Sequence, residues 1–284
     1  MKIPPLTQLK HAVLASFAII LSNCTNIHDT VKAGDSEKLQ QFIVAGGDIN
    51  QLDSYSNSLL HNAVKAGNAE IVKLLIDKGA NVNTLNMSVN SPLHDAVHGG
   101  NSEIIKLLID AGAVIDKKNN YGNTPLWEAA TARKGEVVKQ LIAAGADVNT
   151  HDRKGNTLIH YAVDSKNHTE IARILIKSGA DINKRNNHGW TPLICAASDG
   201  NTEFLKFLIS AGADVNKPGN GGICAIYWAA VSCNREIVRI LIAAGGDVNQ
   251  EDDCGMTPLY RAVTTTGPMP PGAIKILKDA GGHL

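Results

Sequence analysis

Residues 119–149 read NNYGNTPLWEAATARKGEVVKQLIAAGADVN, and this stretch decides how the whole chain folds. Its ending, Gly-Ala-Asp-Val-Asn, returns with variations at a spacing of 33 residues, with one spacing of 34. The equivalent final positions are Asn50, Asn83, Asp116, Asn149, Asn183, Asn216 and Asn249. A unit of this length cannot bury its apolar face alone, so neighbouring units must stack. The sequence therefore predicts an elongated array, and arrays usually bind rather than catalyse.

Each unit carries signals for two short helices. A hydroxyl residue suited to cap a helix N-terminus precedes a proline, which fits the first helical position because that position needs no N–H. These pairs are Ser91-Pro92, Thr124-Pro125, Thr191-Pro192 and Thr257-Pro258, whereas Leu59, Leu158 and Ala225 replace the proline in other units. Residues 70–76 place apolar side chains on one wide helical stripe. A glycine such as Gly145 then ends the second helix, where a left-handed backbone favours glycine.

The recurring motifs G-x-T-P-L-H, A-A, E-I-V, L-L and G-A-D-V-N resemble the ankyrin repeat over about nine tenths of the chain. The resemblance implies an all-α solenoid of helix-turn-helix units with β-hairpin tips. About seven full repeats would follow a truncated first one. The units are expected at 27–50, 51–83, 84–116, 117–149, 150–183, 184–216, 217–249 and 250–284, within a domain spanning 25–284. The last unit carries an insertion at 264–272 whose prolines exclude a continuous helix.

The first 24 residues differ from the rest and predict an export signal. Lys2 and Lys10 precede an apolar run over 12–21. As a helix this run spans about 15 Å, half of a bilayer core of roughly 30 Å, so a removed signal peptide is favoured over a permanent span. Residues 21–24 resemble a bacterial lipobox ending at Cys24, although Asn23 departs from that pattern. Lipidation at Cys24, ordinary signal cleavage and a buried helix before the array all stay open.

Charge argues against nucleic acid as a partner. The formal net charge is zero, and without the first 23 residues it becomes −2, from 25 basic and 27 acidic residues. Binding to DNA or RNA depends on Lys and Arg neutralising phosphates. We therefore expect a protein partner, a monomeric array, and membrane contact only through a lipid anchor at Cys24.

A column of histidines invites a metal-site interpretation, which spacing argues against. His28, His61, His94 and His160 occupy one repeat position, which Trp127, Ile194, Tyr227 and Tyr260 take elsewhere. Stacked helices lie roughly 8–10 Å apart, whereas zinc ligands lie about 2 Å from the ion. The resemblance implies instead that this histidine bonds the cap residue and nearby backbone. We expect no catalytic residues, no metal and no cofactor, since no sequence motif of an enzyme occurs.

Four cysteines, Cys195, Cys224, Cys233 and Cys254, fall in the last three units. Their even number would suit an exported disulfide protein. Their repeat positions differ, however, so the sequence implies no pairing, and buried thiols are the simpler interpretation. A thiol-based redox enzyme is the least favoured function.

Partners of the ankyrin family usually lie against the concave side, formed by the hairpin tips and the first helices. The tip residue before the cap position is, in order, Asn57, Asn90, Asn123, Asn156, Trp190, Ile223 and Met256. The last three are apolar, and Val231 at the end of a first helix adds to the same region. Because aromatic anchors commonly dominate binding energy, we predict a hot spot at Trp190, Ile223, Val231 and Met256. Tyr55 and Tyr121 are predicted secondary contacts.

These patterns lead to one functional prediction, a non-catalytic protein-binding module of the cell envelope that acts as a scaffold or an inhibitor. The alternative is an effector secreted into a host cell, which would use the same surface on a host protein.

Overall fold

The computed structural model describes residues 26–162, 169–265 and 272–284. The predicted signal peptide, with Cys24, and most of the insertion at 264–272 lie outside these residues. The chain divides into two compact units, Met1–Ala146 and Asp147–Leu284, which are described separately. No helix in the described part of the chain has both the length and the apolar character needed to cross a membrane.

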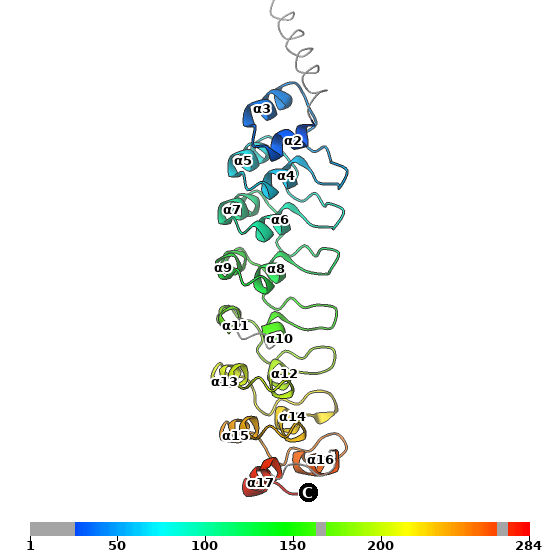
Figure 1. The fold of residues 1–284 in the computed structure, drawn as a ribbon, viewed down its shortest axis with the longest axis vertical. Helices are drawn as coiled ribbons and strands as arrows, with labels where there is room; N and C mark the ends of the chain where they lie inside the picture. The colour runs from blue at the N-terminus through cyan, green and yellow to red at the C-terminus, as the bar shows by residue number, and fades with distance from the viewer. Residues whose placement is uncertain (1–25, 163–168, 266–271) are drawn as a thin grey trace, which may run out of the picture. The chain divides into compact units, whose positions relative to one another are not determined.

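The first unit contains four pairs of antiparallel helices (Figure 1). They are α2 (Ile27–Lys32) with α3 (Ser36–Val44), α4 (Leu59–Lys65) with α5 (Ala69–Asp77), α6 (Pro92–Gly99) with α7 (Ser102–Asp110), and α8 (Pro125–Thr131) with α9 (Gly135–Ala143). The first helices of successive pairs pack on one another, α2 on α4, α4 on α6 and α6 on α8. Within this unit the hairpin tips project from the side of the first helices that lies away from the second helices (Figure 1).

The second unit repeats the same arrangement. Its helices are α10 (Leu158–Tyr161), α11 (Thr169–Lys177), α12 (Pro192–Ser198), α13 (Thr202–Ser210), α14 (Ala225–Val231), α15 (Arg235–Ala243), α16 (Pro258–Thr265) and α17 (Gly272–Asp279), with a short 3-10 helix, η2 (Asn220–Gly222), in one tip. Helix α14 packs between α12 and α16. Both units are thus stacks of paired helices, and the predicted ankyrin-type all-α fold is confirmed; the boundaries assigned to individual repeats stay predictions.

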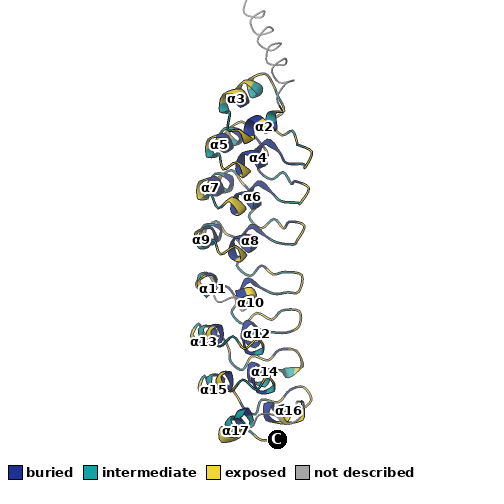
Figure 2. Cartoon of the chain, in the orientation of Figure 1, coloured by how far each residue is buried: buried dark blue, intermediate teal, exposed yellow. Residues whose placement is uncertain are grey.

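Burial explains why the apolar pattern specifies stacking. The first helices have neighbours on both sides, so six of the seven residues of α4 are buried, whereas only three of the nine residues of α5 are. The buried residues of α5 are Ile71, Val72 and Leu75, on the apolar stripe expected from the sequence. Figure 2 shows the same contrast between first and second helices along the chain. The cap prediction is confirmed where the hydroxyl of Thr124 accepts from Trp127 N–H at 3.2 Å.

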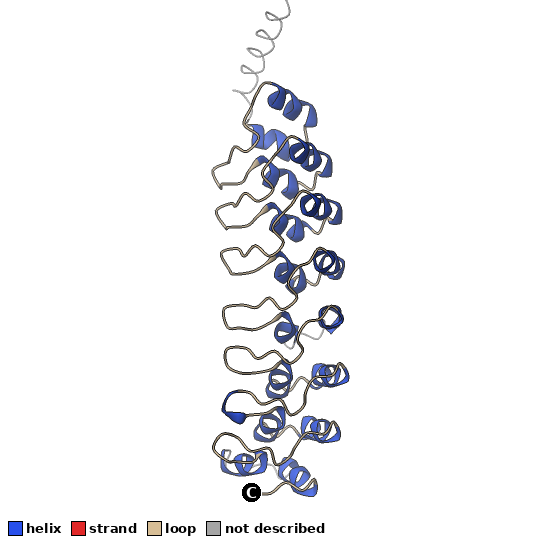
Figure 3. Ribbon diagram, turned by 180° about the vertical axis from the view of Figure 1, so that it is seen from behind, coloured by secondary structure: helices blue, strands red, loops and turns tan. Residues whose placement is uncertain are grey.

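The hairpin tips are tight turns organised by an Asp or Asn side chain. In the tip that begins at Asp53, Oδ1 of this residue accepts from the N–H groups of Tyr55 and Asn57, both at 2.9 Å. Antiparallel bridges occur at Leu52–Ser58 and His151–Thr157, and the described tips contain loops rather than extended strands (Figure 3). Backbone bonds close the same tip, from Asp53 N–H to the Asn57 carbonyl and from Ser56 N–H to the Asp53 carbonyl, both at 2.9 Å. The hairpins are therefore held by side-chain and backbone bonds together and not by an extended β-ladder.

Candidate functional site

The surface that could meet a partner is the inner face, defined here as the hairpin tips and the exposed side of the first helices. The histidine column, at the repeat position of His61, His94 and His160, connects the tips and the first helices of this face. Nδ1 of His61 accepts from Ser58 N–H at 3.1 Å, and Nε2 lies 3.1 Å from the carbonyl oxygen of Asn90 in the next tip. This network assigns the proton to Nε2, which donates to Asn90. Each such histidine therefore ties a helix cap to the following repeat.

The same geometry recurs at two other histidines. Nε2 of His94 lies 3.2 Å from the Asn123 carbonyl, and Nε2 of His160 lies 2.9 Å from the Trp190 carbonyl. Burial lowers the pKa of His61 to about 4 and also lowers the pKa values of His94 and His160. Neutral imidazoles bonded to the cap and the backbone confirm the structural role implied by the family resemblance. Among the described residues, no group of three His, Cys, Asp or Glu side chains could hold a metal ion.

The residue that follows the histidine position forms a second column on the inner face, which we call the cradle column. It holds Asn62, Asp95, Glu128, Tyr161, Cys195, Trp228 and Arg261. In four repeats the tip Asp or Asn nine positions earlier hydrogen-bonds to the cradle residue. These contacts join Asp53 to Asn62 (3.2 Å), Asn119 to Glu128 (2.7 Å), Asp152 to Tyr161 (3.3 Å) and Asp252 to Arg261 (3.0 Å). The tip thus normally satisfies the polar end of the cradle side chain.

Asp95 is one exception to this rule. The tip residue nine positions earlier, Asn86, donates its amide to Asn57 at 3.1 Å instead. Oδ2 of Asp95 is buried and makes no hydrogen bond, although Lys65 Nζ lies 3.4 Å away in an ion pair. That Lys65 nitrogen donates its hydrogen bond to Asn57 at 2.8 Å. Because of burial, the pKa of Asp95 is raised, and so is the pKa of Glu128.

Trp228 is a further exception, for a different reason. Gly219 stands where the tip Asp or Asn would be, and a Cβ there would lie 2.8 Å from the carbonyl oxygen of Gly189. The tip therefore offers no side chain to the indole, and the buried Nε1 of Trp228 makes no hydrogen bond. One cradle position in each unit thus has a buried polar atom without a hydrogen bond, a carboxylate oxygen in the first unit and an indole N–H in the second.

The predicted hot spot of the second unit lies around this tryptophan. The rings of Trp190 and Trp228 are 5.0 Å apart between centroids, and Tyr227 meets Trp228 edge-on at 6.0 Å. Trp190 is half-buried and not free of neighbours. Ile223, Val231 and Met256 are half-buried as well, at the tip of the next repeat, at the end of α14 and at the last tip. The structure thus joins Trp190 to an aromatic cluster, while a role in binding stays a prediction for all four residues.

The predicted secondary contacts belong to the first unit. The side chains of Tyr55 and Tyr121 are 68% and 77% exposed at their tips, so both are accessible to a partner. On the same inner face, a hollow of about 510 Å³ opens between α6 and α8. Its lining residues are Asn90, His94, Asp95, Val97, His98, Glu128, Thr131 and Ala132. Nothing in the residues alone pointed to this hollow.

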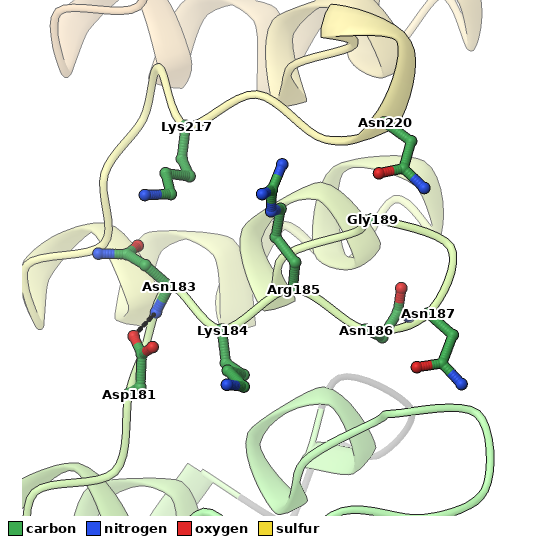
Figure 4. Close-up of a pocket in the computed structure, with 9 residues that line it drawn as sticks. All are labelled: Asp181, Asn183, Lys184, Arg185, Asn186, Asn187, Gly189, Lys217 and Asn220. Atoms are coloured by element: carbon green, nitrogen blue, oxygen red, sulfur yellow. Dashed lines mark hydrogen bonds between the residues drawn. The ribbon is translucent and has the colours of Figure 1, made fainter.

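A second hollow, of about 470 Å³, lies beside the tips of the second unit (Figure 4). Lys184, Arg185 and Lys217 line it, with Arg185 directed toward Lys217 and Lys184 pointing the other way. Asp181 is occupied by the local turn, since its Oδ1 accepts from Asn183 N–H at 2.9 Å. The cations stand on an exposed turn and do not converge, so this hollow has the character of open surface.

The cysteines are poorly placed for thiol chemistry. Cys224 is buried at the cap position of α14, and burial raises the pKa of its thiol. A reactive cysteine needs the opposite, an accessible thiol of low pKa. Cys195 and Cys233 are half-buried, and Cys254 is an exposed thiol at a tip. The prediction of buried thiols is therefore confirmed for Cys224 alone.

Sequence reasoning missed Asp95, Glu128 and Trp228. The prediction compared equivalent residues at the tips and at the ends of the first helices, but it did not compare the residues of the cradle column. Aligning the residue after each histidine position would have shown the change from Asn62, Asp95 and Glu128 to aromatic and other side chains. Oδ2 of Asp95 and Nε1 of Trp228 could not be found in this way. Their lack of a hydrogen bond depends on the direction of the Asn86 side chain and on the absence of a side chain at Gly219.

With this geometry in place, comparison with known proteins assigns the family. The family described as "Ankyrin repeats (3 copies)" matches residues 27–119, 100–186, 126–219 and 183–252, which together cover well over half of the chain. The chain belongs to the ankyrin-repeat family. A search of curated proteins found no match. Ankyrin repeats are typically non-catalytic and generally mediate protein–protein interactions.

Proposed function

We propose that this chain is a binding module without catalytic activity, which holds a partner protein on its inner face as a scaffold or an inhibitor. The observation that carries the proposal is the aromatic cluster of Trp190, Trp228 and Tyr227, in which the indole N–H of Trp228 has no acceptor. A partner that covered the cluster would gain apolar burial against the half-buried rings of Trp190, Tyr227 and Trp228. Aromatic anchors at the centre of an interface commonly carry much of the binding energy.

The frame that presents this cluster is preformed. Caps, tip side chains and the histidine column fix the first helices and tips before any partner arrives. Little conformational entropy would therefore be lost on docking, which favours affinity for a given contact area. Ile223, Val231 and Met256 would extend the apolar centre, and Tyr55 and Tyr121 would add contacts in the first unit.

Replacement of Trp190 tests this proposal. Proteins captured with the wild-type chain would be purified, and their affinities measured by biolayer interferometry against wild type, Trp190→Ala and Arg239→Ala. Arg239 is exposed on the second helix α15, so it serves as the control. We expect Trp190→Ala to weaken binding at least tenfold, about 1.4 kcal/mol, with Arg239→Ala within twofold. A correctly folded Trp190→Ala protein that binds within twofold of wild type would refute the hot spot.

We propose further that the chain is exported and anchored through Cys24, on the basis of residues 1–24 alone. The test is the intact mass and membrane fractionation of the full-length protein in a Gram-negative host, with Cys24→Ala as control. A mature chain that begins at acylated Cys24, and loses the acyl mass in the control, would support an envelope partner. An unmodified soluble chain still beginning at Met1 would contradict export by this signal and favour a role as an effector.

A further inference from the structure

The hollow between α6 and α8 has features that a surface depression lacks. The side chain of Asp95 is only 9% exposed, yet its Oδ2 accepts no hydrogen bond. A buried carboxylate is costly unless it is paired and hydrogen-bonded, and Lys65 pairs with this Oδ2 at 3.4 Å. In four other repeats the tip residue also hydrogen-bonds to the cradle residue, a contact that Asn86 does not make here. Asp95 therefore lines the hollow as a carboxylate that has an ion pair on one oxygen and no hydrogen bond from its own tip.

Glu128 adds a second carboxylate to the same hollow. Its Oε1 accepts from Asn119 at 2.7 Å, so one oxygen is held in place by the tip. Asp95 acts on Glu128 electrostatically in the direction that raises its pKa, which indicates that the two carboxylates share one environment. Thr131, Val97 and Ala132 complete the lining with a hydroxyl and small apolar groups. Two acids above a short apolar wall suit a side chain that has an aliphatic stem and a cationic end.

The nearby positive charges do not fill this site. Lys65 pairs with the buried Oδ2 of Asp95 at 3.4 Å from the α4 side and also donates a hydrogen bond to Asn57, while its side chain is 44% exposed. Lys134 directs its ammonium to the carbonyl groups of Val97 and His98 at the end of α6. The His98 side chain lines the hollow and acts electrostatically on both carboxylates. Lys65 thus offsets the charge of Asp95, and the charge of Glu128 remains in the lining. A metal ion is disfavoured, since no third ligand completes a group there among the described residues.

We infer that the hollow between Asp95 and Glu128 receives an arginine or lysine side chain of the protein bound on the inner face. This inference rests on the proposed function and adds the chemistry of the partner. A guanidinium would lie between the carboxylates of Asp95 and Glu128 where they line the hollow, and its stem would lie along Val97 and Ala132. Fixed carboxylates in a partly buried hollow favour such a cation over a neutral side chain.

The test uses N-acetyl-arginine methylamide as the probe, titrated into the ¹⁵N-labelled full chain and followed by two-dimensional NMR. N-acetyl-lysine methylamide and the neutral citrulline analogue are run in parallel. We expect saturable shifts of the amides of Asp95, His98 and Glu128 with one or both cationic probes. The citrulline analogue should bind at least fivefold more weakly. Equal shifts with the citrulline analogue, or shifts that do not centre on these amides, would overturn the inference.

Two variants and one control variant test whether probe binding depends on this hollow. Asp95→Asn keeps the shape and introduces the residue that Asn62 already is at the equivalent position, so the fold should tolerate it. It should weaken the cationic probe at least fivefold, as should Glu128→Gln. Glu103→Gln removes an exposed acid of α7 and should leave probe binding unchanged. Equal weakening by Glu103→Gln would reduce the effect to general charge and contradict the site. If the probes fail to bind in this way while Trp190→Ala still weakens partner binding, the cation-binding hollow is refuted and the proposed function still stands.

Discussion

The two units build the same frame and put opposite chemistry on it. In the first unit the inner face is a hydrogen-bonded network in which Asn57, Asn86, Lys65 and Asp95 are linked side chain to side chain. In the second unit the equivalent columns carry the Trp190–Trp228 pair and its neighbours. Both units form the same frame, because caps and second-helix packing do not use these side chains; among them, Asn86 holds a tip turn through its Oδ1. A repeat frame can therefore change its surface chemistry without a change of fold.

The largest effect is expected from the frame itself. His61→Ala would leave the buried Ser58 N–H without its acceptor, remove one of the two hydrogen bonds to the Asn90 carbonyl, and open a cavity. Since each unsatisfied group costs about 1–3 kcal/mol, we expect the free energy of unfolding to fall by about 2–4 kcal/mol. Urea denaturation measures this loss, and His188→Ala, at an exposed tip, is the matched control. A loss below about 1 kcal/mol would mean that the histidine column contributes little to the stability of the first unit.

Acid should act on the same column. The folded pKa of His61, about 4, lies below the ordinary histidine pKa of 6.5, so the unfolded chain binds more protons between these values. Stability contributed by the neutral ring is complete above about pH 6.5 and falls as the pH drops toward 4. The pKa values of His94 and His160 are lowered in the same direction. Lys65 and Asp53 also face His61, with opposite effects on its pKa. Denaturation midpoints from pH 7 to 4.5 should fall, with a shallower slope in His61→Ala; equal slopes would exclude this residue as the cause.

The tips differ between the units in backbone strain. In the first unit the left-handed tip position is Ser56 and Val89, at φ 59° and 57°, and Gly122 in its last tip, whereas the second unit uses Gly155 and Gly189 at φ 75° and 79°. A β-branched residue is strained in this region. Val89→Gly should therefore raise the free energy of unfolding by about 1 kcal/mol. Gly155→Val should lower it by at least as much, since its Cβ would collide with the side chain and backbone of Asn187. Thermal melts measure both, and a destabilised Val89→Gly protein would show that the tip is not strained.

Caps provide a smaller contrast. Cys224 stands where Thr124 and Thr191 cap their helices, and sulfur is a weaker acceptor than a hydroxyl. Cys224→Thr should stabilise the second unit by about 0.5–1 kcal/mol. Cys254→Thr, at an exposed tip, should leave the melting temperature unchanged. If Cys224→Thr lowered it, packing of the thiol would outweigh the cap.

The smallest effect is expected at the unused indole. Trp228→Phe keeps an aromatic ring beside Trp190 and removes a buried N–H that has no acceptor. Loss of contact area and relief of the unsatisfied group oppose each other, so stability should change by less than about 1 kcal/mol. Partner affinity should fall several-fold more than this change explains, if the partner packs on the indole ring. Unchanged affinity would contradict that part of the proposed function.

Much of the fold could be predicted because its signals are local. Thr124 and Pro125 begin α8, and Ile71, Val72 and Leu75 lie on the buried stripe of α5, as their spacing indicates. The β-hairpin tips were less well predicted, since Asp53 and its equivalents hold the turns with side-chain bonds. The site was predicted only in part. Trp190 was found from the tip column, but its neighbour Trp228 was not, because their contact joins residues 38 positions apart.

By itself the sequence determined the repeat, the helix ends and the histidine column, because each depends on residues within one 33-residue unit or on its exact recurrence. The tertiary structure decided which polar atoms go unused. Asn86 donates only to Asn57 of the preceding repeat, and Asp95 is paired instead with Lys65 of that repeat. Trp228 lacks a tip contact because the backbone at Gly189 excludes a side chain at Gly219. Both outcomes are set by competition between neighbouring repeats for the same hydrogen bonds and the same space. Spacing along one chain does not contain that information.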